Sequence, residues 1–133
     1  TASHETLIWA AKNSKSKHVF NYEDMKTGRW DGDLFKNEGK QMRSVWAIPT
    51  PGSKEKTEGK HPTQKPLALL ERIITASSQQ NSTVLDPFTG SSTTGIAALK
   101  NGRKFIGIDK SEEFLDLSIR RYRKFIDEEN SYL

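Results

Sequence analysis

Residues 83–109 read TVLDPFTGSSTTGIAALKNGRKFIGID, and this stretch decides the fold. TVLD at 83–86 and KFIGID at 104–109 have the short apolar pattern of buried strands, and the residues between them have the pattern of a helix. Ser111, followed by two glutamates, is typical of the cap of a further helix. We therefore predict an α/β fold built on a parallel strand–helix–strand unit with a right-handed crossover.

The turn between the first strand and its helix, DPFTGSSTTG at 86–95, is rich in small residues. Gly90, Ser92 and Gly95 have the spacing of the dinucleotide-binding G-x-G-x-x-G, with serine at the middle position. Such a turn brings backbone N–H groups and a helix N-terminus against a ligand. Asp109 ends the next strand, where a nucleotide site places a carboxylate for the ribose hydroxyls. The pattern predicts an adenosine-containing cofactor.

Charge favours one cofactor among several. NAD and ATP carry anionic phosphates, which Asp86 would repel, and Ser92 would crowd a pyrophosphate. S-adenosylmethionine carries a cationic sulfonium, an ammonium and a single carboxylate, so an acidic strand end suits it better. We therefore expect S-adenosylmethionine, with a nicotinamide-dependent oxidoreductase as an alternative from another class.

The segments before this unit are less regular. ETLIWAA at 5–11 and KHVFNY at 17–22 predict two strands of a hairpin, and SVWAI at 44–48 predicts a third strand. PTPGSKEKTEGK at 49–60 has the composition of a loop. A helix is predicted to begin at Pro66, because apolar residues of PLALLERIITASS fall on one face.

Composition limits the class of protein. The chain has 133 residues, no cysteine and a net charge of +4, and it begins at Thr1. No apolar run approaches the roughly 20 residues of a membrane span, so we expect a soluble protein without thiolate metal sites, cut from a longer chain. Residues 12–60 hold 11 basic against 7 acidic side chains, which favours a polyanionic partner.

Three stretches together carry a family resemblance: HPTQKP at 61–66, VLDPFTGSSTTGIAAL at 84–99 and RKFIGIDKSEEFLDLSIRR at 103–121. They resemble motifs ten, one and two of the β-class DNA amino-methyltransferases, which methylate adenine N6 or cytosine N4. HETLIWAAKN and HVFNY are similar to that family's hairpin strands. The resemblance implies a partial doubly wound, Rossmann-like class I methyltransferase sheet in permuted order, with the N-terminal catalytic half missing.

The same resemblance implies an organisation and a cofactor site. Residues 1–23 would be hairpin strands of the sheet, 24–60 the target-recognition region, and 61–133 the S-adenosylmethionine-binding βαβ region. Asp109 would hold the ribose and Lys110 would lie beside the adenine. Thr63 and Lys65 would bind the methionine carboxylate; a cation just before a helix also needs an anion for compensation. The residues implied around the methionine part are Asp86, Phe88, Gly90, Ser91, Ser92 and Thr93.

Contacts to double-stranded DNA are expected from the front of the chain. Phe20 and Tyr22 are candidates for stacking on a base flipped out of the duplex. Basic side chains there could meet phosphates or a guanine edge: Lys12, Lys15, Lys17, Arg29, Lys36, Lys40 and Arg43.

The catalytic D-P-P-Y-type tetrapeptide of the family is not found, because the chain contains no Pro-Pro pair. We therefore expect this chain alone to be inactive, and to be stable chiefly beside an amino-terminal segment or chain that carries the tetrapeptide. The resemblance implies adenine-N6 methylation in a bacterial restriction-modification system, in the cytoplasm at the nucleoid, by a possible homodimer. Cytosine-N4 methylation and a non-catalytic cofactor- or DNA-binding subunit stay open.

Overall fold

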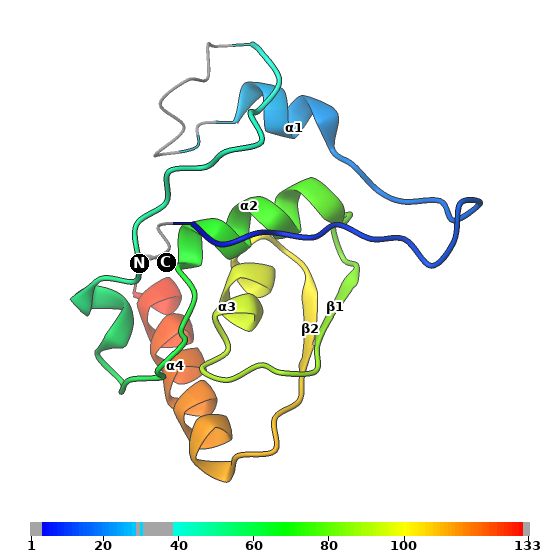
Figure 1. The fold of residues 1–133 in the computed structure, drawn as a ribbon. Coiled ribbons are helices and arrows are strands. Elements are labelled where there is room, and N and C mark those ends of the chain that lie inside the picture. The colour runs from blue at the N-terminus through cyan, green and yellow to red at the C-terminus, as the bar shows by residue number, and fades with distance from the viewer. Residues whose placement is uncertain (1–3, 29, 31–38, 132–133) are drawn as a thin grey trace.

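The structure of the chain is a computed structural model that describes residues 4–28, 30 and 39–131. Its elements follow one another along the chain as Figure 1 shows. They are α1 (Tyr22–Thr27), the short 3-10 helix η1 (Ser53–Lys56), α2 (Leu67–Ser77), β1 (Thr83–Asp86), α3 (Thr93–Lys100), β2 (Lys104–Gly107) and α4 (Glu112–Asn130). From residue 67 onward the predicted elements are all present, and the α/β class is confirmed.

β1 and β2 form a parallel two-stranded sheet in which Val84 pairs with Phe105 and Leu85 with Ile106. The helix α3 connects the strands, as the sequence predicts for a strand–helix–strand unit. Ser111 caps α4, because its side chain accepts a hydrogen bond from the N–H of Phe114 at 3.4 Å. The parallel register brings the carboxyl ends of both strands to the same edge of the sheet.

The hydrophobic core lies between one face of this sheet and two helices. Ile74 of α2 and Ala97 and Ala98 of α3 are buried together, and Val84 and Phe105 of the strands pack against them. Alternate strand residues point to opposite faces. One face of each strand therefore serves this core.

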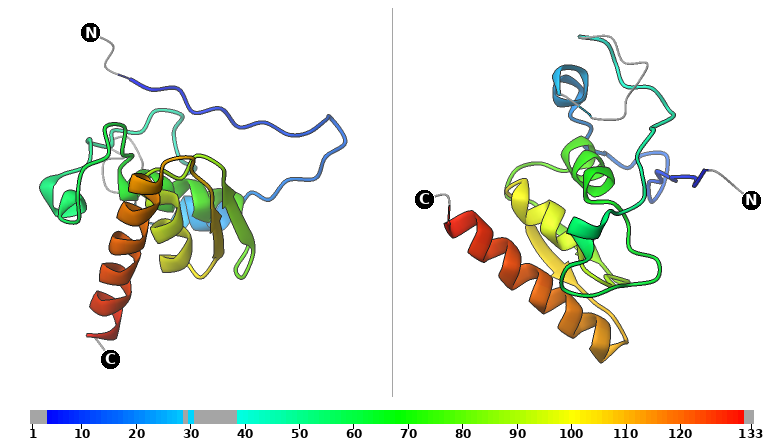
Figure 2. Two further views of the ribbon diagram at one scale, coloured as in Figure 1. Left: turned by 90° about the horizontal axis from the view of Figure 1, so that it is seen from below. Right: turned by 90° about the vertical axis from the view of Figure 1, so that its left-hand side faces the viewer.

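The other face of the sheet is open. Leu85, Ile106 and Ile108 are 60%, 52% and 53% exposed. In the left view of Figure 2, α3 and α4 lie to one side of the strands, and none of the described helices covers the opposite side. An apolar sheet face of this kind is normally covered by another layer of structure.

The strands predicted at 5–11, 17–22 and 44–48 do not form; among the described residues the only strands are β1 and β2. Residues 4–20 run out to a turn at 13–16, where the N–H of Ser16 donates to Asn13 O at 3.1 Å, and then return (Figure 1). Trp9 contacts the rings of His18 and Phe20 across this bend. Because a strand requires a hydrogen-bonded neighbour, extended residues without one remain irregular.

The described residues of the segment at 24–60 are largely irregular, as predicted, but they include part of α1 and the whole of η1, which the sequence did not indicate. Tyr22, expected at the end of a strand, begins α1 instead, and Met25 of α1 is completely buried. Six residues are too few for a stable helix in isolation. Tertiary contacts therefore hold α1, which lies against α2.

Within the described parts of the chain, no helix is both long enough and apolar enough to cross a lipid bilayer.

Candidate cofactor site

The loop between β1 and α3 reverses the chain within six residues. Two of its residues have left-handed backbone angles, Gly90 with φ 51° and Ser92 with φ 58°. Asp86, at the end of β1, holds the loop from inside. One carboxylate oxygen accepts the N–H of Phe88 at 3.0 Å, and the other accepts the hydroxyl of Thr94 at 2.6 Å. Asp86 therefore joins the end of the strand to the first turn of the helix.

Asp109 holds the same loop from the neighbouring strand. Its Oδ2 accepts the N–H of Gly90 at 2.8 Å, and its Oδ1 accepts the N–H of Ser111 at 2.9 Å. These hydrogen bonds, that from Ser111 first, lower the pKa of Asp109 below its ordinary value of 3.8. Partial desolvation opposes this effect, and Lys110 and His61 add to it. Gly90 and Asp109, which lie 19 positions apart in the sequence, are thus in direct contact.

The helix α4 supports the loop from below. The hydroxyl of Ser118 donates to the carbonyl of Gly90 at 2.7 Å, and the guanidinium of Arg121 donates to the carbonyl of Ser91 and to the hydroxyl of Thr93. With the Gly90 carbonyl turned toward α4, the N–H of Ser91 in the same trans peptide points the opposite way. Among the described residues this N–H donates no hydrogen bond, and Ser91 itself is buried.

Sequence reasoning missed both supporting side chains. Ser118 and Arg121 are buried, and burial lowers the pKa of Arg121, which Glu55 partly offsets. The two residues are three positions apart and therefore share a helix face with their buried neighbour Leu117. The sequence could have indicated this role, because a serine and an arginine on the apolar face of α4 need polar partners.

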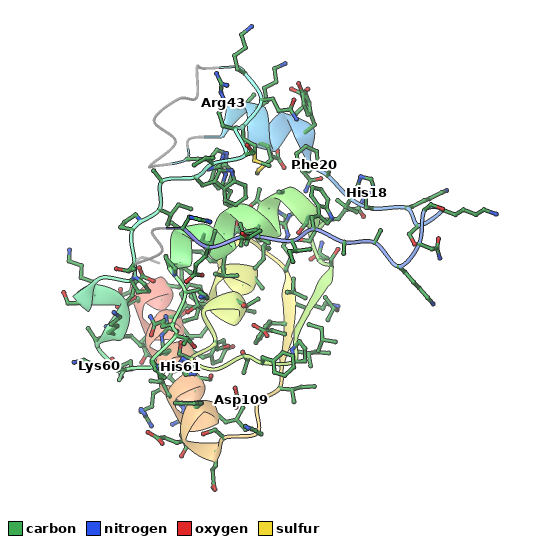
Figure 3. All side chains as sticks on the ribbon, in the orientation of Figure 1. His18, Phe20, Arg43, Lys60, His61 and Asp109 are labelled. Carbon is green, nitrogen blue, oxygen red and sulfur yellow. The ribbon has the colours of Figure 1, made fainter. Side chains whose placement is uncertain are left out.

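His61, in the HPTQKP stretch, forms a wall of the site that was not assigned in advance. Its ring lies 4.1 Å from the ring of Phe114, and its Nδ1 accepts the N–H of Thr63 at 3.2 Å. A Cβ added to Gly90 would lie 2.9 Å from Nε2 of His61. His61 and Asp109 both lie below α3 in Figure 3. The stretch thus reaches the glycine loop, as its predicted role requires.

Lys65 has an anionic partner other than the one we expected. Its Nζ lies 2.7 Å from the Oε2 of Glu5, and both side chains are exposed. Glu5 thus supplies the compensation that we expected from a ligand carboxylate. Thr63 is also exposed, beside His61. The neighbouring Gln64 is buried and fixes the stretch by donating to the carbonyl of Glu55 at 2.8 Å.

The remaining predicted cofactor residues divide into two groups. Ser91, Ser92 and Thr93 are buried in the loop, and the N–H of Ser92 closes a turn by donating to Thr89 O at 2.7 Å. Phe88 is 87% exposed and Lys110 is exposed as well. The first group shapes the backbone, and the second is accessible to a ligand.

The structure does not bring the predicted DNA-contacting residues to the loop. Lys12, Lys15 and Lys17 are exposed at and beside the turn that projects from the body (Figure 1), and Lys40 and Arg43 are exposed in the irregular segment. Arg29 and Lys36 lie outside the described residues. Phe20 contacts Trp9 at 5.3 Å and Tyr22 at 6.5 Å between ring centroids. Figure 3 shows Phe20 and Arg43 at the opposite end of the fold from His61 and Asp109.

Comparisons with known proteins identify what the chain is similar to. The family model described as N6_N4_Mtase, DNA methylase, matches residues 1–120. The type II methyltransferase M2.MboI of Moraxella bovis is 52% identical over 93% of this chain and 42% of its own length. M2.LlaDCHI of Lactococcus lactis subsp. cremoris is 50% identical over 93% of the chain and 44% of its own. The chain therefore spans less than half the length of these curated relatives.

A solved structure gives the same result for the fold. The crystal structure of the M1.HpyAVI–SAM complex superimposes with a TM-score of 0.60 at 42% identity, covering 81% of this chain and 45% of that one. Most of this chain therefore shares its fold with part of a protein that was crystallised with SAM.

Proposed function

Because the chain belongs to the N6/N4 DNA methylase family, we propose that it forms the cofactor-binding and target-recognition part of a type II DNA methyltransferase. Its reaction would transfer a methyl group from S-adenosylmethionine to N6 of adenine in a specific duplex site. The observation that carries the proposal is the hydrogen bond between Asp109 and the N–H of Gly90, which joins the two halves of the site.

The residues present fit S-adenosylmethionine. Asp86 and Asp109 place two carboxylates beside the loop, which would repel a pyrophosphate but favour an ammonium and a sulfonium. The N–H of Ser91, which donates no hydrogen bond among the described residues, would donate to the cofactor's carboxylate, and a side chain at Gly90 would contact His61. When bound, the cofactor supplies an electrophilic methyl group on a cationic sulfur.

Each residue then has a proposed role. Asp109 accepts hydrogen bonds from the ribose hydroxyls while its pKa stays low enough to keep it ionised. Lys110 lies beside the adenine, and Thr63 and Lys65 hold the methionine carboxylate once Lys65 leaves Glu5. The loop residues enclose the methionine part: Asp86, Phe88, Gly90, Ser91, Ser92 and Thr93.

We propose the same division of the chain as the resemblance implies. Residues 1–23 belong beside the sheet, 24–60 form the target-recognition region, and 61–133 bind the cofactor. The open apolar face made by Leu85, Ile106 and Ile108 supports a further layer supplied by an amino-terminal part. The family's D-P-P-Y-type tetrapeptide, which orients the target amine, belongs to that part.

Cytosine N4 is the second candidate target, because the matching family model covers both reactions. The deciding residue lies in the tetrapeptide, usually aspartate for adenine and serine for cytosine. A chain that holds cofactor and DNA without the tetrapeptide would be a non-catalytic subunit.

One experiment tests the function. We expect the 133-residue chain, together with the amino-terminal part of the Moraxella bovis relative, to bind S-adenosylmethionine by calorimetry, and the chain by itself to transfer no tritiated methyl group to bacterial DNA. Adding the amino-terminal part of the Moraxella bovis relative should restore transfer, and mass spectrometry of the hydrolysed DNA should find N6-methyladenine. N4-methylcytosine would select the second target. Micromolar NAD binding without a response to S-adenosylmethionine would contradict the proposal.

The projecting turn carries a separate prediction. If Lys12, Lys15 and Lys17 each neutralise a phosphate, replacing all three by glutamine should reduce the slope of log Kd against log salt by about 2.7, because each contact contributes about 0.9. Fluorescence anisotropy with labelled duplex DNA at several salt concentrations measures the slope. Lys100→Gln is the matched control, because Lys100 pairs with Glu71 at 2.7 Å. An unchanged slope in the triple variant would show that these three lysines do not contact DNA phosphates.

A further inference from the structure

Arg72 is a buried cation on the side of α2 that faces away from the core. Its side chain is 1% exposed, and its guanidinium carbon lies 4.1 Å from the ring centroid of Trp46 and 5.6 Å from that of Trp30. Ile74, two positions further along α2, points into the core with Ala97. Residues two apart lie about 200° apart around a helix, so α2 contacts the core with one side and the two tryptophans with the other.

Both tryptophans come from the region at 24–60 that we propose as the target-recognition region. That region has few elements of its own, namely part of α1 and the four-residue η1 among its described residues. It therefore depends on contacts with the rest of the chain for its position. Figure 3 shows side chains filling the space between α2 and the overlying irregular chain that carries Arg43.

Asn21 provides a second attachment, at the start of α1. Its N–H donates to Ala76 O at 2.9 Å, and its side-chain amide donates to the carbonyls of Thr75 at 2.7 Å and Ser78 at 2.8 Å. The last carbonyls of a helix have no donors within the helix. Asn21 thus fixes the beginning of the region on the C-terminal turn of α2, and Arg72 fixes a later part of it one to two turns earlier.

The contact at Trp46 leads directly to a predicted DNA-binding residue. The indole Nε1 of Trp46 donates to the carbonyl of Arg43 at 2.7 Å. This hydrogen bond fixes the ring in its plane, and the guanidinium of Arg72 lies over that ring. The position of the Arg43 backbone is therefore set by a series of contacts that ends on α2, while the Arg43 side chain is exposed.

We propose that Arg72 pins residues 39–48 to α2 and is thereby a positioning residue for the DNA-recognition surface. The second part rests on the proposed function of 24–60. Arginine is required because a planar guanidinium stacks on an indole face, whereas the ammonium of lysine is a compact, strongly hydrated charge. Arg72 does not touch the glycine loop, so its effect falls on DNA binding and not on cofactor binding.

The test compares Arg72→Met, Arg72→Lys and Trp46→Leu in the 133-residue chain, with and without the amino-terminal part of the Moraxella bovis relative. Arg72→Met retains the apolar stem and should weaken binding to labelled duplex DNA about tenfold, with the Kd for S-adenosylmethionine unchanged within twofold. Arg72→Lys should recover little of the loss. Trp46→Leu should resemble Arg72→Met, and the double variant should bind no more weakly than either single variant.

Hydrogen exchange provides a readout that is independent of DNA. Amides of residues 39–48 should exchange faster in Arg72→Met than in the unmodified chain, while those of β1 and β2 keep their protection. If the unmodified chain bound cofactor but no DNA, the proposed function would fail. The exchange rates of residues 39–48 would then still show whether Arg72 holds them on α2. Equal DNA affinity in all variants, unchanged exchange in 39–48, or a parallel loss of cofactor affinity would each overturn the proposal.

Discussion

Replacing Gly95 by alanine is expected to lower the free energy of unfolding by about 2 kcal/mol. A Cβ at this position would lie 2.5 Å from Oγ of Ser92 and 2.6 Å and 2.7 Å from two ring carbons of Phe105. Phe105 packs against the core and cannot move away freely. Overpacking costs up to about 3 kcal/mol, and alanine in place of glycine within a helix returns about 1 kcal/mol.

Urea denaturation followed by circular dichroism measures this difference. Gly52→Ala is the matched control, because a Cβ there meets no atom within 4 Å and its φ of −75° suits any residue. Its free energy of unfolding should change by less than about 0.5 kcal/mol. Phe105→Leu in the Gly95→Ala background should recover part of the loss. Equal stability of Gly95→Ala and the unmodified chain would contradict the close packing of α3 on β2.

Asp109→Ala is expected to weaken the binding of S-adenosylmethionine about a hundredfold. The substitution removes the acceptor for the N–H of Gly90 and for the proposed ribose hydroxyls, and hydrogen bonds to charged groups are among the strongest in proteins. Released from Asp109, the loop also loses one of its links to the end of β2, while the N–H of Thr89 still donates to Ile108 O at 2.9 Å. Calorimetric titration measures the affinity.

Asp116→Ala serves as the control, because Asp116 is exposed on α4 and should leave the affinity unchanged. Asp109→Asn removes the charge and keeps the shape of the side chain. Its amide oxygen can still accept the N–H of either Gly90 or Ser111, but its NH₂ group would face the other N–H. If Asp109→Ala bound S-adenosylmethionine as tightly as the unmodified chain, Asp109 would not be a cofactor-binding residue.

The lowered pKa of Asp109 makes the stability difference between the unmodified chain and Asp109→Asn depend on pH. Because the folded state lowers this pKa below 3.8, the ionised carboxylate contributes stability above that value and loses it as the pH falls through the folded-state pKa. The difference in unfolding free energy between the unmodified chain and Asp109→Asn should therefore be constant above about pH 5. It should shrink below pH 3.8. Urea denaturation at a series of pH values measures it.

The elements that could be predicted are those whose signals are local. Val84 and Phe105 lie in short apolar runs that become paired strands, and Ser111 carries its own capping signal. The contact of Asp109 with Gly90 was also predictable, because in a parallel unit the ends of adjacent strands must meet at one edge. Here local pattern and tertiary packing agree, so sequence reasoning is sufficient.

The residues that could not be predicted depend on distant partners. Trp9 and Phe20 are as typical of strands as Phe105, but without a neighbouring strand they remain in an extended, irregular chain. The helix α1 depends on contacts that begin 54 residues away, where Asn21 donates to Thr75. Arg121 resembles any basic residue of a charged helix until α4 places it under the loop. No local pattern indicates such long-range contacts.

The two-sided character of α2 has a consequence for protein engineering. Among the described residues, the contacts that fix the overlying region on this helix include three hydrogen bonds from Asn21 and the guanidinium of Arg72 over the rings of Trp46 and Trp30. A segment from a relative with asparagine at position 21 and tryptophan at position 46 could make the same contacts with α2. The core residues on the other side of α2 would not need to change. If residues 24–60 recognise the target as proposed, chimaeras made by exchanging residues 21–48 between relatives should keep the cofactor-binding part and change the DNA sequence that is bound.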